Sequence, residues 1–348
     1  MKKITAQVRV VAIDLSKQVF HVAGEDARGQ VIYEDSCKTR ESFAAFLKTL
    51  QSDQQVLMET GPGAQAWARE LVSRQIDAKV LPAQLVAQHR SVAKNDRNDA
   101  LAILRAGRDT AIHAVPIKSA ERLALQALHR VRSRYVRNRT AVSNEMRGLL
   151  LEHGVALAKG ESALESGLTR ILETSKVPLP RRLRELIADL SAEWEQLGRR
   201  IERLTAELTA SAHADPVARR LMTVPGIGPI SAAAMVCKEP QPERYASARH
   251  FAASFGLVPD QHSTGGKTRL GGLSKRGDPY IRSLFIQGAQ AVLRQVRQPA
   301  ESAAENRLQR WLRHHGRKGA AVRLANRNLR IVWRLLREGT DYHAEVQA

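Results

Sequence analysis

Residues 8–14 have the sequence VRVVAID, a short apolar run rich in β-branched side chains that ends in a carboxylate. Such a run is typical of a central strand that is buried on both faces. Residues 55–59, QVLME, repeat this arrangement and end in Glu59. Ligands bind at the carboxyl ends of the strands in open α/β sheets, so Asp14 and Glu59 are candidate site residues. Taken singly, each is equally well explained as a turn-starting or edge carboxylate.

The segments around these two strands predict an α/β domain with the order β-β-β-α-β-α-β-α. Gly24 and Gly29 separate the early strands, which is typical of an antiparallel meander. A Gly-Pro-Gly break at residues 61–63 ends the second buried strand. The predicted strands are residues 8–14, 19–22, 30–34, 55–59 and 78–81, and the predicted helices are residues 42–50, 64–74 and from 83 onward.

Two further carboxylates, Asp96 and Asp99, belong to the sequence KNDRNDA at residues 94–100. In a helix they share one face, with their Cβ atoms about 5–6 Å apart. A solvated acidic first turn, favoured by the helix dipole, explains this pair by itself. If the pair meets Asp14 and Glu59, however, four carboxylates need divalent cations, and oxygen ligands favour Mg²⁺ or Mn²⁺. Two such ions about 3.5–4 Å apart would clamp the oxygens of a phosphoryl transfer.

The composition predicts a nucleic-acid partner. The 348 residues include 55 Lys plus Arg against 35 Asp plus Glu, which gives a formal net charge of +20. Such an excess favours a polyanion, because each neutralised phosphate releases counterions. The chain is 43% hydrophobic but only 4% aromatic, which indicates a globular protein with a large share of helix.

The same composition argues against a membrane or secreted protein. The sequence has no apolar run of 18 residues and no hydrophobic signal core after its two N-terminal lysines. Its two cysteines, Cys37 and Cys237, show no metal-ligand spacing and favour a reducing compartment. We therefore expect a cytoplasmic, nucleoid-associated protein.

Residues 119–152 predict one long basic helix, because they contain no proline and a single glycine. Arg130, Arg134 and Arg137 belong to its basic face, which suits a phosphate backbone. The alternative is a solvated face that only keeps the protein soluble.

Residues 183–208 carry apolar side chains in alternating spacings of four and three, over about four heptads. This stripe predicts a coiled coil, whose partner helix is the basic helix of the same chain, of a second subunit, or of both.

The last third contains two loops that suit phosphates. In the sequence PGIG at residues 225–228, Gly226 and Gly228 match the hairpin of a helix-hairpin-helix, where backbone N–H groups approach a phosphate. The alternative is an ordinary turn between two helices. The second loop, residues 260–277, is rich in glycine and carries four basic candidates for phosphate binding. These are Lys267, Arg269, Lys275 and Arg276.

Ser263 lies in this second loop. A serine can attack phosphorus if a base or a metal takes its proton. The residues alone favour a turn serine over a nucleophile.

The four carboxylates, with the sequence blocks around them, resemble a known set. Asp14, Glu59, Asp96 and Asp99 match the DEDD set of RuvC-like nucleases of the ribonuclease-H fold. The blocks resemble still more closely the DEDD transposases of the insertion-sequence one-ten family, which includes the Piv-type invertases. That family has Thr where this chain has Asn95, another small polar residue. The three blocks are AIDLSK at residues 12–17, METG at 58–61 and KNDRNDA at 94–100.

The resemblance extends to the serine loop. The family carries a nucleophilic serine between a Gly-Leu-x-Pro break and a Ser-Lys element, which stand here as residues 256–259 and 274–275. Ser263 occupies the matching position, whereas Ser274 does not. The resemblance thus covers nearly the whole chain, and it implies a nucleophilic role for Ser263.

The resemblance implies a fold of α/β plus all-α class in three domains. Residues 1–115 would form a RuvC-like ribonuclease-H-fold domain whose DEDD site binds metal. Residues 116–212 would form a helical coiled-coil spacer used in dimerisation, and residues 213–348 a helical transposase domain with the helix-hairpin-helix and the serine loop.

The implied function is that of a DNA transposase-recombinase of an insertion sequence. It would use Mg²⁺, with two ions at the DEDD site and Mn²⁺ as a substitute, and act on donor and target DNA as a dimer or tetramer. A structured bridge RNA would pair with both DNAs. Three alternatives stay open: a RuvC-like junction nuclease in which water attacks, a Piv-like site-specific invertase, and a helix-hairpin-helix scaffold that only binds nucleic acid.

Overall fold

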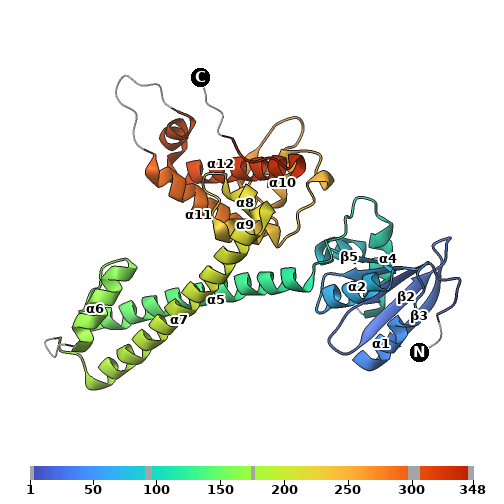
Figure 1. Cartoon of the computed structure of the whole chain (residues 1–348), viewed down its shortest axis with the longest axis horizontal. Coiled ribbons are helices and arrows are strands. Elements are labelled where there is room, and N and C mark those ends of the chain that lie inside the picture. The colour runs from blue at the N-terminus through green and yellow to red at the C-terminus, as the bar shows by residue number, and fades with distance from the viewer. Residues whose placement is uncertain (1–3, 91–95, 174–176, 297–305, 344–348) are drawn as a thin grey trace. The chain divides into compact units, whose positions relative to one another are not determined.

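The computed structural model describes residues 4–90, 96–173, 177–296 and 306–343. The chain folds as two compact units, residues 1–120 and 121–348 (Figure 1). None of the described helices is both long enough and apolar enough to cross a membrane. The division into three domains stays a prediction.

Unit 1 is a mixed five-stranded sheet of order β3-β2-β1-β4-β5. The first three strands form an antiparallel meander, whereas β1–β4 and β4–β5 are parallel pairs. The predicted order of strands and helices in this part of the chain is confirmed. The elements are β1 (Val10–Asp14), β2 (Phe20–Glu25), β3 (Val31–Cys37), α1 (Arg40–Leu47), β4 (Gln55–Glu59), α2 (Ala64–Ser73), β5 (Asp77–Leu81), α3 (Ala83–Val86), η1 (Ala87–His89) and α4 (Asp96–Arg108).

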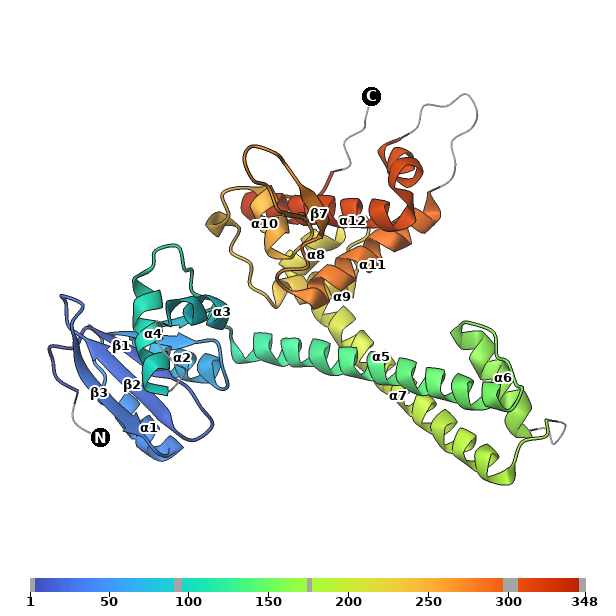
Figure 2. The ribbon, with the colours of Figure 1, turned by 180° about the vertical axis from the view of Figure 1, so that it is seen from behind.

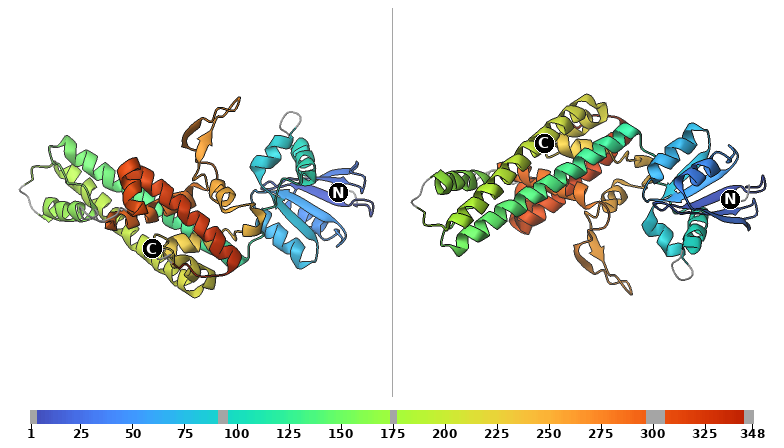
Figure 3. Two further views of the ribbon diagram at one scale, coloured as in Figure 1. Left: turned by 90° about the horizontal axis from the view of Figure 1, so that it is seen from above. Right: turned by 90° about the horizontal axis from the view of Figure 1, so that it is seen from below.

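Helices cover both faces of this sheet, as the continuous apolar runs of its central strands β1 and β4 require. Successive side chains of a strand point to opposite faces, so Val11 and Ile13 pack in the core with α1 and α2. Ala12 and Leu57 instead pack in the core beneath α4. Helix α4 lies so close to the sheet that a Cβ on Gly107 would stand 2.2 Å from a Leu57 methyl. Figures 2 and 3 show α4 and α2 on opposite sides of the sheet.

Unit 2 is almost entirely helical apart from one hairpin, β6–β7. Its C-terminal part has one apolar core to which α8, α9, α10, α11 and α12 all contribute. The elements are α5 (Ala120–Glu152), α6 (Glu161–Glu173), α7 (Arg181–Ala214), α8 (Pro216–Met222), α9 (Pro229–Val236), η2 (Pro242–Arg244), α10 (Ala248–Ser254), β6 (Pro259–Gln261), β7 (Leu270–Leu273), α11 (Pro279–Gln295) and α12 (Arg307–Glu338).

The apolar stripe of α7 is buried against helices of the same chain. Ile187, Trp194 and Leu197 share one core with residues of α5 and α6. The guanidinium of Arg139 on α5 lies 4.0 Å from the centre of the Trp194 ring. The buried apolar residues of α5 are Val142, Met146 and Leu150, which follow at intervals of four. The coiled-coil geometry stays a prediction.

Helix α5 is joined to α11 through a buried histidine. His129 is 3% exposed, and its Nδ1 lies 3.0 Å from the hydroxyl of Tyr280. Burial, together with the nearby cation of Arg132, lowers the pKa of His129 from 6.5 to about 4. The imidazole is therefore neutral in the folded protein at neutral pH.

This pKa predicts a pH-dependent stability. Between pH 4 and 6.5 the unfolded chain binds the His129 proton and the folded chain does not, so the free energy of unfolding rises with pH across that window. Urea unfolding at about pH 7 and about pH 4.5 should show that wild type loses about 2 kcal/mol more than His129→Gln on acidification. Equal losses in the two proteins would contradict the assignment.

Candidate active site

The two strand-end carboxylates of unit 1 lie side by side. The parallel register pairs Val10 with Gln55 and Ile13 with Met58. The next position in this register brings Asp14, the last residue of β1, beside Glu59, the last residue of β4. Adjacent strands lie about 4.8 Å apart, so the two carboxylates emerge as neighbours at the carboxyl edge of the sheet.

Both carboxylates belong to the face of the sheet that α4 covers. Ala12 and Leu57 lie in the core beneath α4, and Asp14 and Glu59 each follow by two positions in an alternating strand. Oε2 of Glu59 is fully buried.

Helix α4 brings a further carboxylate to the same face. Asp99 is 6% exposed, and its Oδ1 lies 2.6 Å from Nε of Arg90. A buried carboxylate is costly unless a positive charge is close, and Arg90 places such a charge beside Asp99. Asp96 is the first residue of α4, and its side chain lies outside the described part of the structure.

The structure thus places three candidate residues at one edge and face of the sheet, with Asp96 on the helix that covers that face. Among the described side chains, which exclude that of Asp96, no group of three His, Cys, Asp or Glu is arranged to hold a metal ion. The one positive partner described there, Arg90, was missed by the sequence analysis. A lone arginine just before the acidic stretch carries no motif that could have singled it out.

Ser263 lies in the hairpin of unit 2, between β6 and β7, and is exposed. Its Oγ accepts a hydrogen bond from the Gln261 side-chain amide at 2.8 Å and one from the backbone N–H of Arg269 at 3.1 Å. Both groups donate their hydrogen to the Ser263 oxygen, so they hold that oxygen in place and favour negative charge on it. Gly265 and Gly266, both with positive φ, form the turn at the hairpin tip. Figure 3 shows the hairpin extending away from the helices of unit 2.

Basic side chains surround this serine. Lys267 and Arg269 are exposed along the hairpin. Nη2 of Arg276 lies 3.9 Å from Oδ1 of Asp260, and the other oxygen of that carboxylate lies 3.2 Å from Nε2 of His262. The predicted Lys267, Arg269 and Arg276 therefore lie with Ser263 on one hairpin, as does Lys275 at its base.

The base of the hairpin is held by a close contact between two turns. A Cβ on Gly277 would stand 1.9 Å from the carbonyl oxygen of Ser254, and one on Gly256 would stand 2.1 Å from that of Arg276. Both glycines have positive φ, as does Lys275 between them in sequence, at 55°. The side chain of Arg282 donates to the carbonyls of Phe255 and Arg276, at 3.0 Å each. The flexible loop predicted from its glycines is therefore anchored firmly at its base.

The turn between α8 and α9 contains the other two glycine candidates. Gly226 has a φ of 91° and packs against α11, because a Cβ on Gly288 would stand 1.8 Å from the Gly226 carbonyl oxygen. Gly228 precedes α9 and faces open space. Both glycines line a cavity between this turn and α11. The helix-hairpin-helix stays a prediction.

The three arginines predicted on the basic helix are exposed. Arg130, Arg134 and Arg137 follow one another at intervals of four and three on α5, so they share a face. Arg134 also lies 5.3 Å from the centre of the Tyr135 ring.

Comparison with known families supports the resemblance drawn from these residues. Residues 11–154 match the model of a DEDD transposase family, described as a transposase. Residues 218–305 match the model described as the transposase IS116/IS110/IS902 family. The first match spans the strand-end carboxylates and α4, and the second spans the serine hairpin.

Individual relatives match along nearly the whole chain. A "Probable family 20 transposase" of Pseudomonas aeruginosa is 41% identical over 333 residues, which cover 95% of this chain and 98% of the relative. The transposase for insertion sequence element IS1111A of Coxiella burnetii is 34% identical over 96% of this chain and 91% of its own length. The transposase for insertion sequence element IS1328 of Yersinia enterocolitica is 34% identical over 96% of this chain and 98% of its own length.

These similarities agree with the α/β sheet of unit 1 and with the many helices of the chain. The chain belongs to the IS110/IS116/IS902 family of insertion-sequence transposases, enzymes that cut and rejoin DNA.

Proposed function

We propose that this transposase uses Ser263 as its nucleophile. Oγ attacks the phosphorus of a DNA phosphodiester, a P–Oγ bond forms, a P–O bond to the adjoining sugar breaks, and the released DNA hydroxyl takes up a proton. The observation that carries the proposal is the hairpin itself: an exposed serine with two donors on Oγ, on an arm whose base is fixed. Lys267, Arg269 and Arg276 would hold the phosphate backbone around it.

The acidic residues of unit 1 fit a divalent metal. Asp14 and Glu59 emerge as neighbours, Asp99 lies on the helix over the same face, and all offer oxygen ligands. Asp14, Glu59, Asp96 and Asp99 would hold Mg²⁺, as two ions or with Mn²⁺ as a substitute. Bound metal would stabilise the charge on the reacting phosphate and lower the pKa of a coordinated hydroxyl.

The choice of DNA sequence would come from a bridge RNA that pairs with donor and target DNA. The exposed arginines of α5, Arg130, Arg134 and Arg137, support this proposal because they give a basic face for a nucleic-acid backbone. Gly228, at the start of α9, would bring backbone N–H groups to a phosphate in a helix-hairpin-helix.

The active assembly would be a dimer or tetramer in the cytoplasm, associated with the nucleoid. The long helices α5 and α7 would contribute a coiled coil to it. The length of α7, Arg181–Ala214, supports this, because a helix of that length offers surface beyond its own core contacts. Ser263 and the carboxylates would then act within one chain or between two.

The first prediction concerns the serine. With labelled DNA and Mg²⁺, wild type should form a covalent protein–DNA species that survives denaturation, and Ser263→Ala should form none, since no other Oγ takes its place. Ser274→Ala is the matched control. It removes a hydroxyl from the same loop, but the Oγ of Ser274 is buried, so this variant should still form the adduct. Denaturing gels would measure both.

Two outcomes would count against the serine. An adduct that persists in Ser263→Ala would show that another residue attacks. Metal-dependent cleavage by wild type with no adduct would favour a RuvC-like nuclease in which water attacks.

The second prediction concerns the carboxylates. Asp14→Asn and Asp99→Asn should reduce strand exchange by more than about 100-fold and weaken Mn²⁺ binding in titration calorimetry, because each loses a charged oxygen ligand. Nucleic-acid affinity should change little. Asp77→Asn, at the opposite end of β5 from the site, is the control and should match wild type. Unchanged Mn²⁺ binding and recombination in the first two variants would exclude the metal site.

A further inference from the structure

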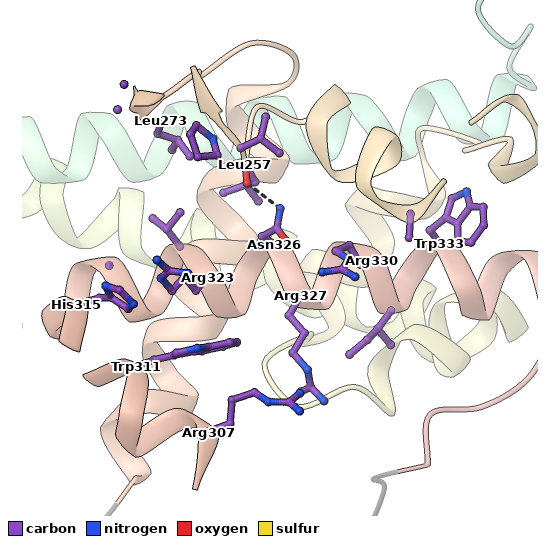
Figure 4. A pocket seen from close by; sticks show the side chains of 18 of the residues that line it. Leu257, Leu273, Arg307, Trp311, His315, Arg323, Asn326, Arg327, Arg330 and Trp333 are labelled. Carbon is purple, nitrogen blue, oxygen red and sulfur yellow. Dashed lines mark hydrogen bonds between the residues drawn. The ribbon is translucent and has the colours of Figure 1, made fainter. Parts of the chain in front are cut away.

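Helix α12 and the base of the serine hairpin enclose a cavity of about 990 Å³ (Figure 4). The hairpin side is formed by residues 257–259 and 271–273, and the helix contributes most of the rest. In Figure 4, Leu257 and Leu273 lie on one side of the helix and Trp311 on the other. The polar and aromatic lining residues that matter most are Arg307, Trp311, His315, Arg323, Arg327 and Arg330.

A break in α12 builds this cavity. Gly316 has φ 63° and ψ 175°, a conformation that essentially only glycine adopts. Arg307 and Arg327 are 20 residues apart, about 30 Å along a straight helix, yet both line the cavity. Gly319 contributes too, because a Cβ there would stand 2.8 Å from Cβ of His315. Gly316 thus divides α12 into two helical segments.

Uncompensated positive charge gathers in the cavity. Arg323, Arg327 and Arg330 follow at intervals of four and three and share a face of α12. Within the described ranges, neither these three nor Arg307 makes an ion pair with a carboxylate. In Figure 4 the side chains of Arg307 and Arg327 extend toward each other. The positive charges of these arginines repel one another. The cavity therefore favours an anion with several phosphates.

The field of these arginines acts on their neighbour His315. Loss of hydration lowers the pKa of His315, and the cation of Arg323 lowers it further. Near neutral pH, the positive charge of the cavity therefore belongs to its arginines.

Trp311 gives the cavity an aromatic wall. It is half-buried, and among the described residues no guanidinium lies over its ring. The second tryptophan of the cavity, Trp333, is already engaged: its Nε1 donates to the Pro242 carbonyl at 2.9 Å, and Arg337 lies 5.1 Å from its ring centre. Trp311 is thus the ring on which a flat ligand can stack.

The cavity is joined directly to the serine hairpin. The side-chain amide of Asn326 on α12 donates to the carbonyl of Leu257 at 2.8 Å. Leu257 belongs to the turn that holds the base of the hairpin, and Gly271 to Leu273 of β7 line the cavity. A ligand bound here lies at the foot of the arm that carries Ser263.

We propose that this cavity binds a single strand of nucleic acid, with one unstacked base on Trp311 and the flanking phosphates on Arg307, Arg323 and Arg327. A hollow with an aromatic wall suits a base that is free to leave its stack, whereas the bases of a duplex are covered by their neighbours. The inference rests on the proposed function only in taking nucleic acid as the ligand. The strand is DNA or RNA, since both offer phosphates and a stacking base.

The test measures binding of labelled 12-nucleotide strands of DNA and of RNA, and of the DNA duplex, to the full-length protein. Arg307→Gln/Arg327→Gln should weaken single-strand binding about tenfold or more and reduce the salt slope by about 1.4, that is, 0.7 for each phosphate contact. Arg310→Gln on the outer side of α12, which removes a charge but does not line the cavity, should lose threefold or less.

Abasic strands test the stacking. Trp311→Leu should weaken binding of the normal strand about tenfold and leave binding of the strand with abasic sites unchanged. The abasic strand has no base that could stack on Trp311, so it has no stacking contact to lose. Thermal unfolding would confirm that each variant is folded. The nucleic acid whose binding these substitutions weaken more, DNA or RNA, is the strand that the cavity binds.

The proposal fails if the double variant binds single strands as Arg310→Gln does, if Trp311→Leu affects normal and abasic strands alike, or if the duplex binds wild type as tightly as the single strand does. A separate assay for the covalent adduct at Ser263 distinguishes failure of this inference from failure of the proposed function. An adduct without strand binding at the cavity overturns only the inference, and strand binding without an adduct overturns only the nucleophile.

Discussion

Parallel pairing of β1 with β4 places Asp14 beside Glu59. The negative charge of these two carboxylates determines which groups can lie near them. Carboxylates brought together on a partly buried face repel one another unless a cation stands between them. For Asp99 the described structure supplies that cation from Arg90, at 2.6 Å. For the group as a whole, the proposed divalent metal would supply the remaining positive charge.

In unit 2 it is positive charge, not negative charge, that is concentrated. Its hairpin and its last helix gather arginines and lysines, and several of those that line the α12 cavity have no described carboxylate partner. A bound phosphate backbone would relieve this repulsion, as the proposed metal would relieve that of the carboxylates in unit 1. The glycine contacts at residues 256 and 277 and the clamp by Arg282 fix the arm on which Ser263 is presented. Backbone packing therefore holds the base of the hairpin that carries Ser263, and Lys267 and Arg269 are exposed on the same hairpin.

Much of unit 1 could be predicted from sequence, because strand periodicity and the Gly-Pro-Gly break are local signals. Asp14, Glu59 and Asp99 were found because two strands end in acids and the acidic stretch has helical spacing. Arg90 could not be found, since its ion pair with Asp99 is a tertiary contact without a motif. The cavity that Trp311 lines could not be predicted, because it depends on the break at Gly316, which brings together residues 20 positions apart. The spacing of Arg323, Arg327 and Arg330 was a readable signal of a basic face, but the sequence could not show that this face encloses a cavity.

The most direct measurement of the central claim is peptide mapping by mass spectrometry of the protein after reaction with DNA and Mg²⁺. Nuclease digestion of any covalent species leaves a nucleotide on the residue that attacked phosphorus. The mechanism proposed above predicts that this nucleotide is joined through phosphate to Ser263, on the peptide that includes Gln261 and His262. A nucleotide found on any other residue would contradict it, and so would cut DNA with every peptide unmodified.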